Sequence, residues 1–127
     1  MKKAAAGLAA TLLLVGLGFA APKPKSQSFA GEIMDSQCSA MGSHAGMLKE
    51  EGMADKDPND AMAKQMCTDK CVKMGGKYVL FNSETKTVYQ LTDQKKPAQF
   101  AGQKVNVKGK LNEEKKTIKV ASIEKAS

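Results

Sequence analysis

The second half of the chain contains two pairs of strand-like segments, and each pair is joined by a short polar turn. Residues 77–82 form a continuous apolar run between polar flanks, which is typical of a strand covered on both faces. Residues 87–92 follow the turn and pair back against this run. Residues 103–111 alternate between apolar and polar side chains, and residues 117–124 return after a second turn. These two hairpins predict a small, mainly β fold.

A fifth strand is predicted before the hairpins, over residues 29–36. A connector over residues 97–102, with one helical turn, separates the hairpins. The out-of-phase Ile123 predicts either a β-bulge or the end of the strand near Ser122. Five strands with a small helical element before the fourth predict a small five-stranded OB-like barrel, whose closure leaves no exposed sheet edge. The predicted fold class is mainly β, with a helical, cysteine-containing insertion over residues 37–76 after the first strand.

The strongest helix signal lies inside this insertion. Asp57 is placed to cap a helix that begins at Pro58 and ends at about Lys73, before two glycines. Residues 37–56 have no clean periodicity and predict a loop with one short helix. The apolar face of the predicted helix carries Ala63, Cys67, Cys71 and Met74.

The N-terminus has the layout of a secretory signal peptide over residues 1–20: two lysines, an apolar stretch and a small-x-small cleavage site. Residues 21–28 are polar and contain proline, which predicts a flexible lead-in. Residues 29–127 are long enough for one domain only, and no later run is long enough to span a membrane. We therefore expect a bacterial protein that is periplasmic or secreted, without a transmembrane segment in the mature chain.

Three cysteines and the only histidine of the chain form a candidate metal site. Cys38, His44, Cys67 and Cys71 are ligands of the kind that complete a tetrahedral zinc shell. Cys67 and Cys71 are four residues apart, so one helix face holds both at about 6 Å, within reach of a single ion. Three thiolates also suit Cu(I), which prefers soft ligands. Zinc and copper are thus both candidate cofactors.

The same three cysteines are candidates for a disulfide, because exported proteins oxidise their thiols. A Cys38–Cys67 or Cys38–Cys71 bond would join the insertion to the first strand and contribute on the order of 3 kcal/mol. A Cys67–Cys71 bond within an intact helix would be strained. Either pairing leaves one thiol over. The disulfide and the metal site both require that Cys38, at the end of the first strand, faces the inward side of the helix.

Methionine is abundant around these cysteines. Met62, Met66 and Met74 recur at helical spacing, and we expect them to fill the core. Met41 and Met47 are the better candidates for thioether ligands of a soft ion.

Several segments of the chain carry a resemblance to known proteins: residues 31–38, His44, and residues 67–75, 77–80, 101–111 and 116–120. Through them the chain resembles a group of small exported bacterial proteins of unknown function over nearly all of its mature length. The cysteine and histidine positions are the most specific part of the resemblance. It implies an OB-like fold and export, and it implies no activity.

The charge of the chain is unevenly distributed. Residues 44–63 carry more acids than lysines, whereas residues 64–127 are strongly basic. OB folds often bind nucleic acid, but stacking requires exposed aromatic side chains beside the positive charge. The chain has no tryptophan and only six other aromatic residues. We expect four of them inside the barrel, namely Tyr78, Phe81, Tyr89 and Phe100. We therefore expect no nucleic-acid partner, and expect an unidentified envelope protein or a small ligand instead.

Two functions follow from these observations. The first is an exported, non-catalytic structural or binding module, in which a Cys/His cluster staples the helical insertion by a disulfide. The alternative is a periplasmic metal-binding protein with a Cys3His site. Asp35 and Ser36, beside Cys38 and His44, offer base and nucleophile types, but no third orienting residue or oxyanion motif accompanies them. We therefore expect no enzymatic activity.

Overall fold

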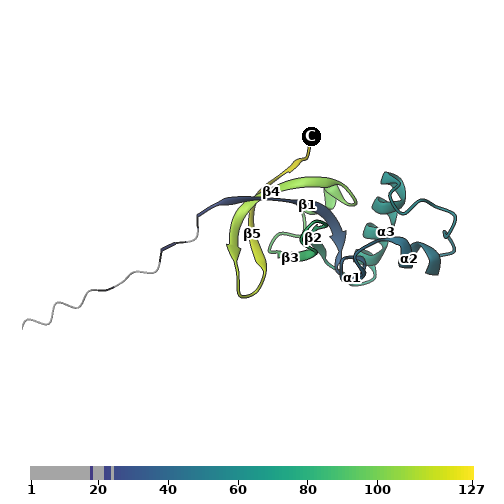
Figure 1. The fold of residues 1–127 in the computed structure, drawn as a ribbon, viewed down its shortest axis with the longest axis horizontal. Coiled ribbons are helices and arrows are strands. Elements are labelled where there is room, and N and C mark those ends of the chain that lie inside the picture. Colours follow the sequence, from purple (N-terminus) through teal and green to yellow (C-terminus); the bar gives the residue numbers. More distant parts are fainter. Residues whose placement is uncertain (1–17, 19–21, 24) are drawn as a thin grey trace, which may run out of the picture.

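The computed structural model describes residues 18, 22, 23 and 25–127, and its centre is a five-stranded sheet that closes into a ring. The ring runs in the order β1-β2-β3-β5-β4, and only β3 and β5 pair in parallel (Figure 1). The predicted signal peptide lies on residues that, apart from Gly18, are outside the described ones. The strands are β1 (Gln27–Asp35), β2 (Tyr78–Asn82), β3 (Thr87–Leu91), β4 (Lys104–Asn112) and β5 (Thr117–Lys125).

Strand β1 closes the ring because it is long enough to pair with two neighbours. Its first part pairs with β4, and its last four residues pair with β2. It begins two residues earlier than predicted, because Gln27 already pairs with Gly109 of β4. Of the two features predicted near Ser122, the structure contains the bulge, and β5 continues to Lys125. Lys108 pairs with Ser122 and Gly109 with Val120, so the register of β5 shifts by one residue at Ala121.

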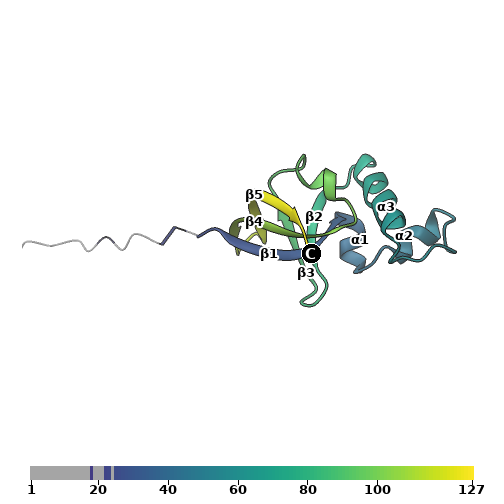
Figure 2. The same ribbon diagram turned by 90° about the horizontal axis from the view of Figure 1, so that it is seen from above.

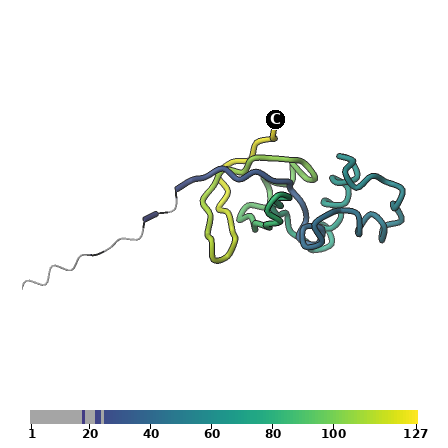
Figure 3. Tube along the Cα trace, viewed as in Figure 1, coloured from purple at the N-terminus to yellow at the C-terminus, as the bar shows by residue number. Residues whose placement is uncertain are grey.

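Three helices follow β1 and lie together at one end of the ring, and we call them the helical layer (Figure 2). The Cα trace shows that part of the connection between the second and third of them lies at the outer end of this layer, away from the strands (Figure 3). A short 3-10 helix, η1 (Pro97–Phe100), occupies the predicted connector before β4. The three helices are α1 (Ser36–Met41), α2 (Ala45–Glu50) and α3 (Ala61–Lys73).

The predicted start of the long helix is wrong by three residues. Helix α3 begins at Ala61, and the side chain of Asp60 accepts a hydrogen bond from the Ala63 amide at 2.9 Å. Asp57 instead accepts from the Asn59 amide and closes a turn. Each aspartate can accept from an amide two or three residues ahead, so the sequence offers two equivalent starts. The predicted end at Lys73 is confirmed, and the region predicted as loop contains two helices rather than one.

The buried residues of β1 and β2 alternate between two separate cores, which explains the continuous apolar run. Ile33, Tyr78 and Leu80 point into the ring, where they pack with residues of β3, β4 and β5. Met34 and Val79 point outward, where the helical layer covers them. The prediction of a strand covered on both faces is therefore confirmed. The outer core consists of Met34, Cys38, Met47, Leu48, Ala63, Cys67, Cys71, Val79 and Phe81.

Two predictions about side chains are wrong. Phe81 packs under the helical layer rather than inside the ring, because its position in β2 faces outward. Met62, Met66 and Met74 are 70%, 51% and 58% exposed rather than buried. Helix α3 buries only the face that carries its cysteines, because a single layer of helices covers the strands from one side.

Among the described residues, no helix is both long and apolar enough to cross a membrane.

Candidate functional site

Three cysteine thiols meet between the helical layer and the ring, and we call them the thiol cluster. Cys38 comes from α1, and Cys67 and Cys71 come from successive turns of α3. The sulfurs of Cys38 and Cys67 lie 3.6 Å apart, and all three sulfurs lie within 4.8 Å of one another. All three thiols are free and almost fully buried. Ala63, Cys67 and Cys71 of the predicted inward face are buried, whereas Met74 is exposed. Cys38 lies in a short helix rather than at the end of the strand.

Asp35 fixes the position of Cys38. It is the last residue of β1 and the N-cap of α1, and its Oδ1 accepts hydrogen bonds from the amides of Gln37 and Cys38 at 2.9 Å. Its Oδ2 is buried and has no hydrogen-bond partner within the described part of the chain. The sequence indicates Asp35 only as a base type beside Ser36, and not as a metal donor. The available signal was an aspartate directly before Ser36, which is typical of a helix N-cap.

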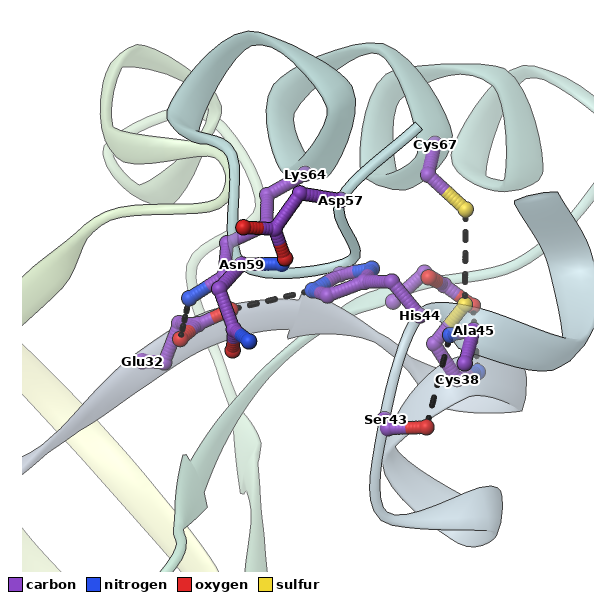
Figure 4. Close-up of polar contacts among 10 residues, drawn as sticks. Glu32, Cys38, Ser43, His44, Ala45, Asp57, Asn59, Lys64 and Cys67 are labelled. Atoms are coloured by element: carbon purple, nitrogen blue, oxygen red, sulfur yellow. Dashed lines mark hydrogen bonds and ion pairs between the residues drawn. The ribbon is translucent and has the colours of Figure 1, made fainter. Parts of the chain in front are cut away.

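His44 is held by a hydrogen bond to Glu32, which also pairs with Lys64, and the sequence indicates neither Glu32 nor Lys64 as a site residue. Its Nε2 lies 3.0 Å from one carboxylate oxygen of Glu32, and the Lys64 ammonium donates to the other at 2.8 Å. The imidazole lies between Glu32 and the pair Cys38 and Cys67 (Figure 4). Because an ionised carboxylate only accepts hydrogen bonds, Nε2 carries the proton, and in the neutral ring Nδ1 then presents a lone pair.

The Nδ1 atom of His44 is buried and has no hydrogen-bond partner among the described residues. A ring nitrogen of His44, an oxygen of Asp35 and the sulfur of Cys38 lie within 4.8 Å of one another. Cys38 thus belongs to two groups of metal-type donors: the thiol cluster, and a second group that it forms with Asp35 and His44. The four residues proposed from the sequence are brought to one region, with Asp35 as an unpredicted fifth.

Burial controls the ionisation of the thiols. It raises the pKa of Cys38 far above the ordinary value, and the nearby Asp35 carboxylate adds to the effect. Burial also raises the pKa of Cys67, and it raises that of Cys71 to about 11, again with a contribution from Asp35. The thiols therefore remain protonated when no cation is present. A bound cation reverses this preference, because a coordinating thiol loses its proton.

The Glu32 carboxylate has the opposite shift. Burial on its own would raise the pKa, but the hydrogen bonds from His44 and Lys64 and the positive charge of Lys64 hold the pKa of Glu32 below its ordinary value of 4.5. Glu32 therefore stays ionised and keeps accepting from His44 Nε2.

Two pockets reach residues of this site. One has a volume of about 520 Å³ and is lined in part by Glu32, His44 and Lys64. The other, which we call the methionine pocket, has a volume of about 270 Å³. Its lining consists of Met47, Glu51, Met53, Met66, Cys67, Lys70 and Cys71.

The geometry of the thiol cluster suits two kinds of chemistry. Two sulfurs that bind one tetrahedral zinc ion at 2.3 Å lie about 3.8 Å apart, which is close to the 3.6 Å between Cys38 and Cys67. A disulfide requires the same two sulfurs to approach to about 2.05 Å. No family model matches the chain, and no curated protein or solved structure matches it either.

Proposed function

We propose that this chain is an exported metal-binding protein whose ion is held by Cys38, Cys67 and Cys71, with Asp35 and His44 as further donors. One observation carries the proposal: Asp35 Oδ2 and His44 Nδ1 are buried without partners beside a buried thiol. Buried polar atoms are nearly always hydrogen-bonded, because an unpaired one loses its hydration without compensation. A cation bound at Cys38 would satisfy both atoms and also offset the burial of the thiolates.

Zinc and Cu(I) are the ions that this donor set favours. Sulfur and imidazole nitrogen are preferred ligands of both, whereas magnesium and calcium prefer oxygen. The Glu32 carboxylate behind His44 is the outer partner that metal-bound histidines usually have, because it fixes the tautomer and strengthens the ligand.

The test is the metal content of fully reduced protein after equilibration with zinc or Cu(I) and removal of free ion. We expect about one ion per chain, since three buried thiols within 4.8 Å of one another form a preformed site, and such sites bind zinc or Cu(I) with dissociation constants far below micromolar. The double variant C67S/C71S should lose the ion, and the control M62S, on an exposed face of the same helix, should keep it. Less than about a tenth of an equivalent in the wild type would contradict the proposal.

A second candidate function is supported by the 3.6 Å between the sulfurs of Cys38 and Cys67. In this alternative the chain is a non-catalytic structural or binding module, and a Cys38–Cys67 disulfide staples α3 to the end of β1. Alkylation of protein taken directly from its native compartment, followed by mass spectrometry, separates the two. Three alkylated thiols contradict the disulfide, and a single alkylated thiol contradicts the metal site.

We further propose that the fold is OB-like and that the chain is not an enzyme. The strand order and the 3-10 helix before β4 support the first point. The raised pKa of Cys38 supports the second, because a nucleophilic cysteine requires a lowered one. Export to the periplasm or beyond is supported by the signal-peptide pattern of the first 20 residues.

A further inference from the structure

The methionine pocket leads from the surface of the helical layer to the thiol cluster. Met66, which lines it, is 51% exposed, Met53 is half-buried, and Met47 is 8% exposed. Cys67 and Cys71 line the same pocket and are 4% and 1% exposed. The sulfur atoms around this pocket therefore range from solvent-exposed to fully buried.

The thiol cluster is reached from this pocket in a definite order. Cys67 and Cys71 line the methionine pocket, whereas Cys38 is fully buried and does not. An ion that enters by this pocket meets thioethers, then the two thiols of α3, and then Cys38. Glu51 and Lys70, which also line the pocket, form an ion pair with each other, so their charges cancel and leave little repulsion for a cation.

Thioether sulfur distinguishes between the two ions that suit the thiol cluster. It is a soft, neutral ligand that binds Cu(I) well and zinc poorly. It also has no proton to lose, whereas each thiol must release a proton to solvent before it binds. Thioethers can therefore hold Cu(I) weakly while the buried thiols deprotonate.

We propose that the methionine pocket is the uptake route for Cu(I), in which Met66, Met53 and Met47 pass the ion to Cys67 and Cys71. This inference rests on the proposed metal-binding function and makes Cu(I) the ion of that site. The ion remains Cu(I) throughout, and the exchange replaces thioether bonds with thiolate bonds and releases the thiol protons. On this route the thioethers determine the rate of Cu(I) uptake, whereas the thiolates determine the final affinity.

The test measures the rate at which Cu(I) passes from its coloured bicinchoninate complex to fully reduced protein without oxygen. The variant M47L/M53L/M66L keeps the apolar volume of the pocket and removes its sulfurs. The control M62L/M74L removes two thioethers that are exposed elsewhere on the helical layer and are not among the candidate ligands. We expect the pocket variant to take up Cu(I) about tenfold more slowly, with the final amount unchanged, because the thiolates dominate the equilibrium affinity. The control should match the wild type.

The single variant M66L keeps the test valid if the triple variant misfolds, because the Met66 side chain is half exposed and its substitution leaves the core unchanged. We expect it to slow uptake by about threefold, as it removes one of three weak ligands. Uptake by the pocket variant within about twofold of the wild type would overturn the route while leaving the metal site intact. A wild type that binds zinc but no Cu(I) would also overturn the route alone, and one that binds neither ion would overturn the route and the proposed function together.

Discussion

Glu32 determines which nitrogen of His44 is available to an ion. Its carboxylate accepts from Nε2, and this contact leaves Nδ1 as the atom without a partner. Lys64 holds the carboxylate from the other side. Glu32 is therefore a positioning residue, which acts on the proposed ion through His44.

The first prediction concerns the substitution Glu32→Gln. It keeps the size of the side chain but removes the charge that strengthens the imidazole as a ligand, so we expect metal affinity to fall by about tenfold. Competition with a chromophoric chelator measures the affinity, and circular dichroism checks the fold. The control E84Q changes an exposed glutamate that lines the same pocket of about 520 Å³ as Glu32. It should bind the ion as the wild type does. Unchanged affinity in E32Q would remove His44 from the ligand set.

The second prediction concerns the ionisation of the Tyr78 hydroxyl at alkaline pH. Burial and the hydrogen bond that its hydroxyl donates to Asp69 raise its pKa from the ordinary value of 10 to about 12. A raised folded-state pKa means that this stabilisation is complete below pH 10 and is lost as the pH rises towards 12. We expect the free energy of unfolding to decline over this interval more in the wild type than in Y78F. Difference absorbance of tyrosinate should place the ionisation that Y78F abolishes at about pH 12; a value near 10 would contradict the buried hydrogen bond.

At the scale of elements, the contact between α3 and the start of β4 depends on one glycine. Gly102 has a φ of +73°, and its amide donates to the carbonyl of Ile33 at 2.8 Å. A Cβ placed there would lie 2.6 Å from the backbone nitrogen of Gln65 in α3. The backbone of the helix cannot move aside as a flexible side chain can. Gly102 therefore sets how closely α3 approaches the ring.

The third prediction compares G102A with G52A. Gly52 has a φ of +71° but no atom within 4 Å of the same Cβ position, so G52A measures the cost of the backbone conformation alone, about 1–2 kcal/mol. We expect G102A to cost about 1–3 kcal/mol more, because overpacking adds to it. Chemical denaturation measures both values. Equal losses of unfolding free energy in G102A and G52A would show that α3 moves aside without a free-energy cost. The proposed site would then lack a rigid support.

At the scale of the whole molecule, the two cores predict an uneven response to metal. The outer core contains the thiol cluster, whereas the inner core lies within the ring. An ion at the thiol cluster joins α1 directly to α3. The β4–β5 hairpin, in contrast, is held by its own pairing and by the inner core.

The fourth prediction is that metal slows hydrogen exchange most strongly in the helical layer. At an ion concentration 100 times the dissociation constant, binding adds about 2.7 kcal/mol to the free energy of unfolding. Local openings of α1 and α3 break the site, so we expect their amides to gain the most protection, and those of the β4–β5 hairpin to gain the least. Exchange measured by mass spectrometry, with and without the ion, checks this. Removal of the ion by a chelator should reverse the change, and uniform protection would contradict a site confined to the helical layer.

The strands, an irregularity of β5 near Ser122 and the end of α3 could be predicted from the sequence, because they depend on local patterns. The alternation in β4, the apolar run of β2 and the glycines after Lys73 each act within a few residues. The start of α3 could not be chosen, because Asp57 and Asp60 offer equivalent caps. Spacing along α3 alone was enough to place Cys67 and Cys71 on its buried face.

The composition of the site was decided by the tertiary structure. Nothing in the spacing of Glu32, Asp35 and Lys64 indicates that they meet around His44, because Glu32 and Lys64 are far apart in the sequence and come together only when α3 packs against β1. The same packing exposes Met62, Met66 and Met74, since it buries a single face of α3. Local side-chain patterns therefore determined which elements form and which cysteines face inward. The approach of the helical layer to the ring determined which polar atoms remain without partners beside those cysteines, because burial and pairing depend on contacts between distant segments.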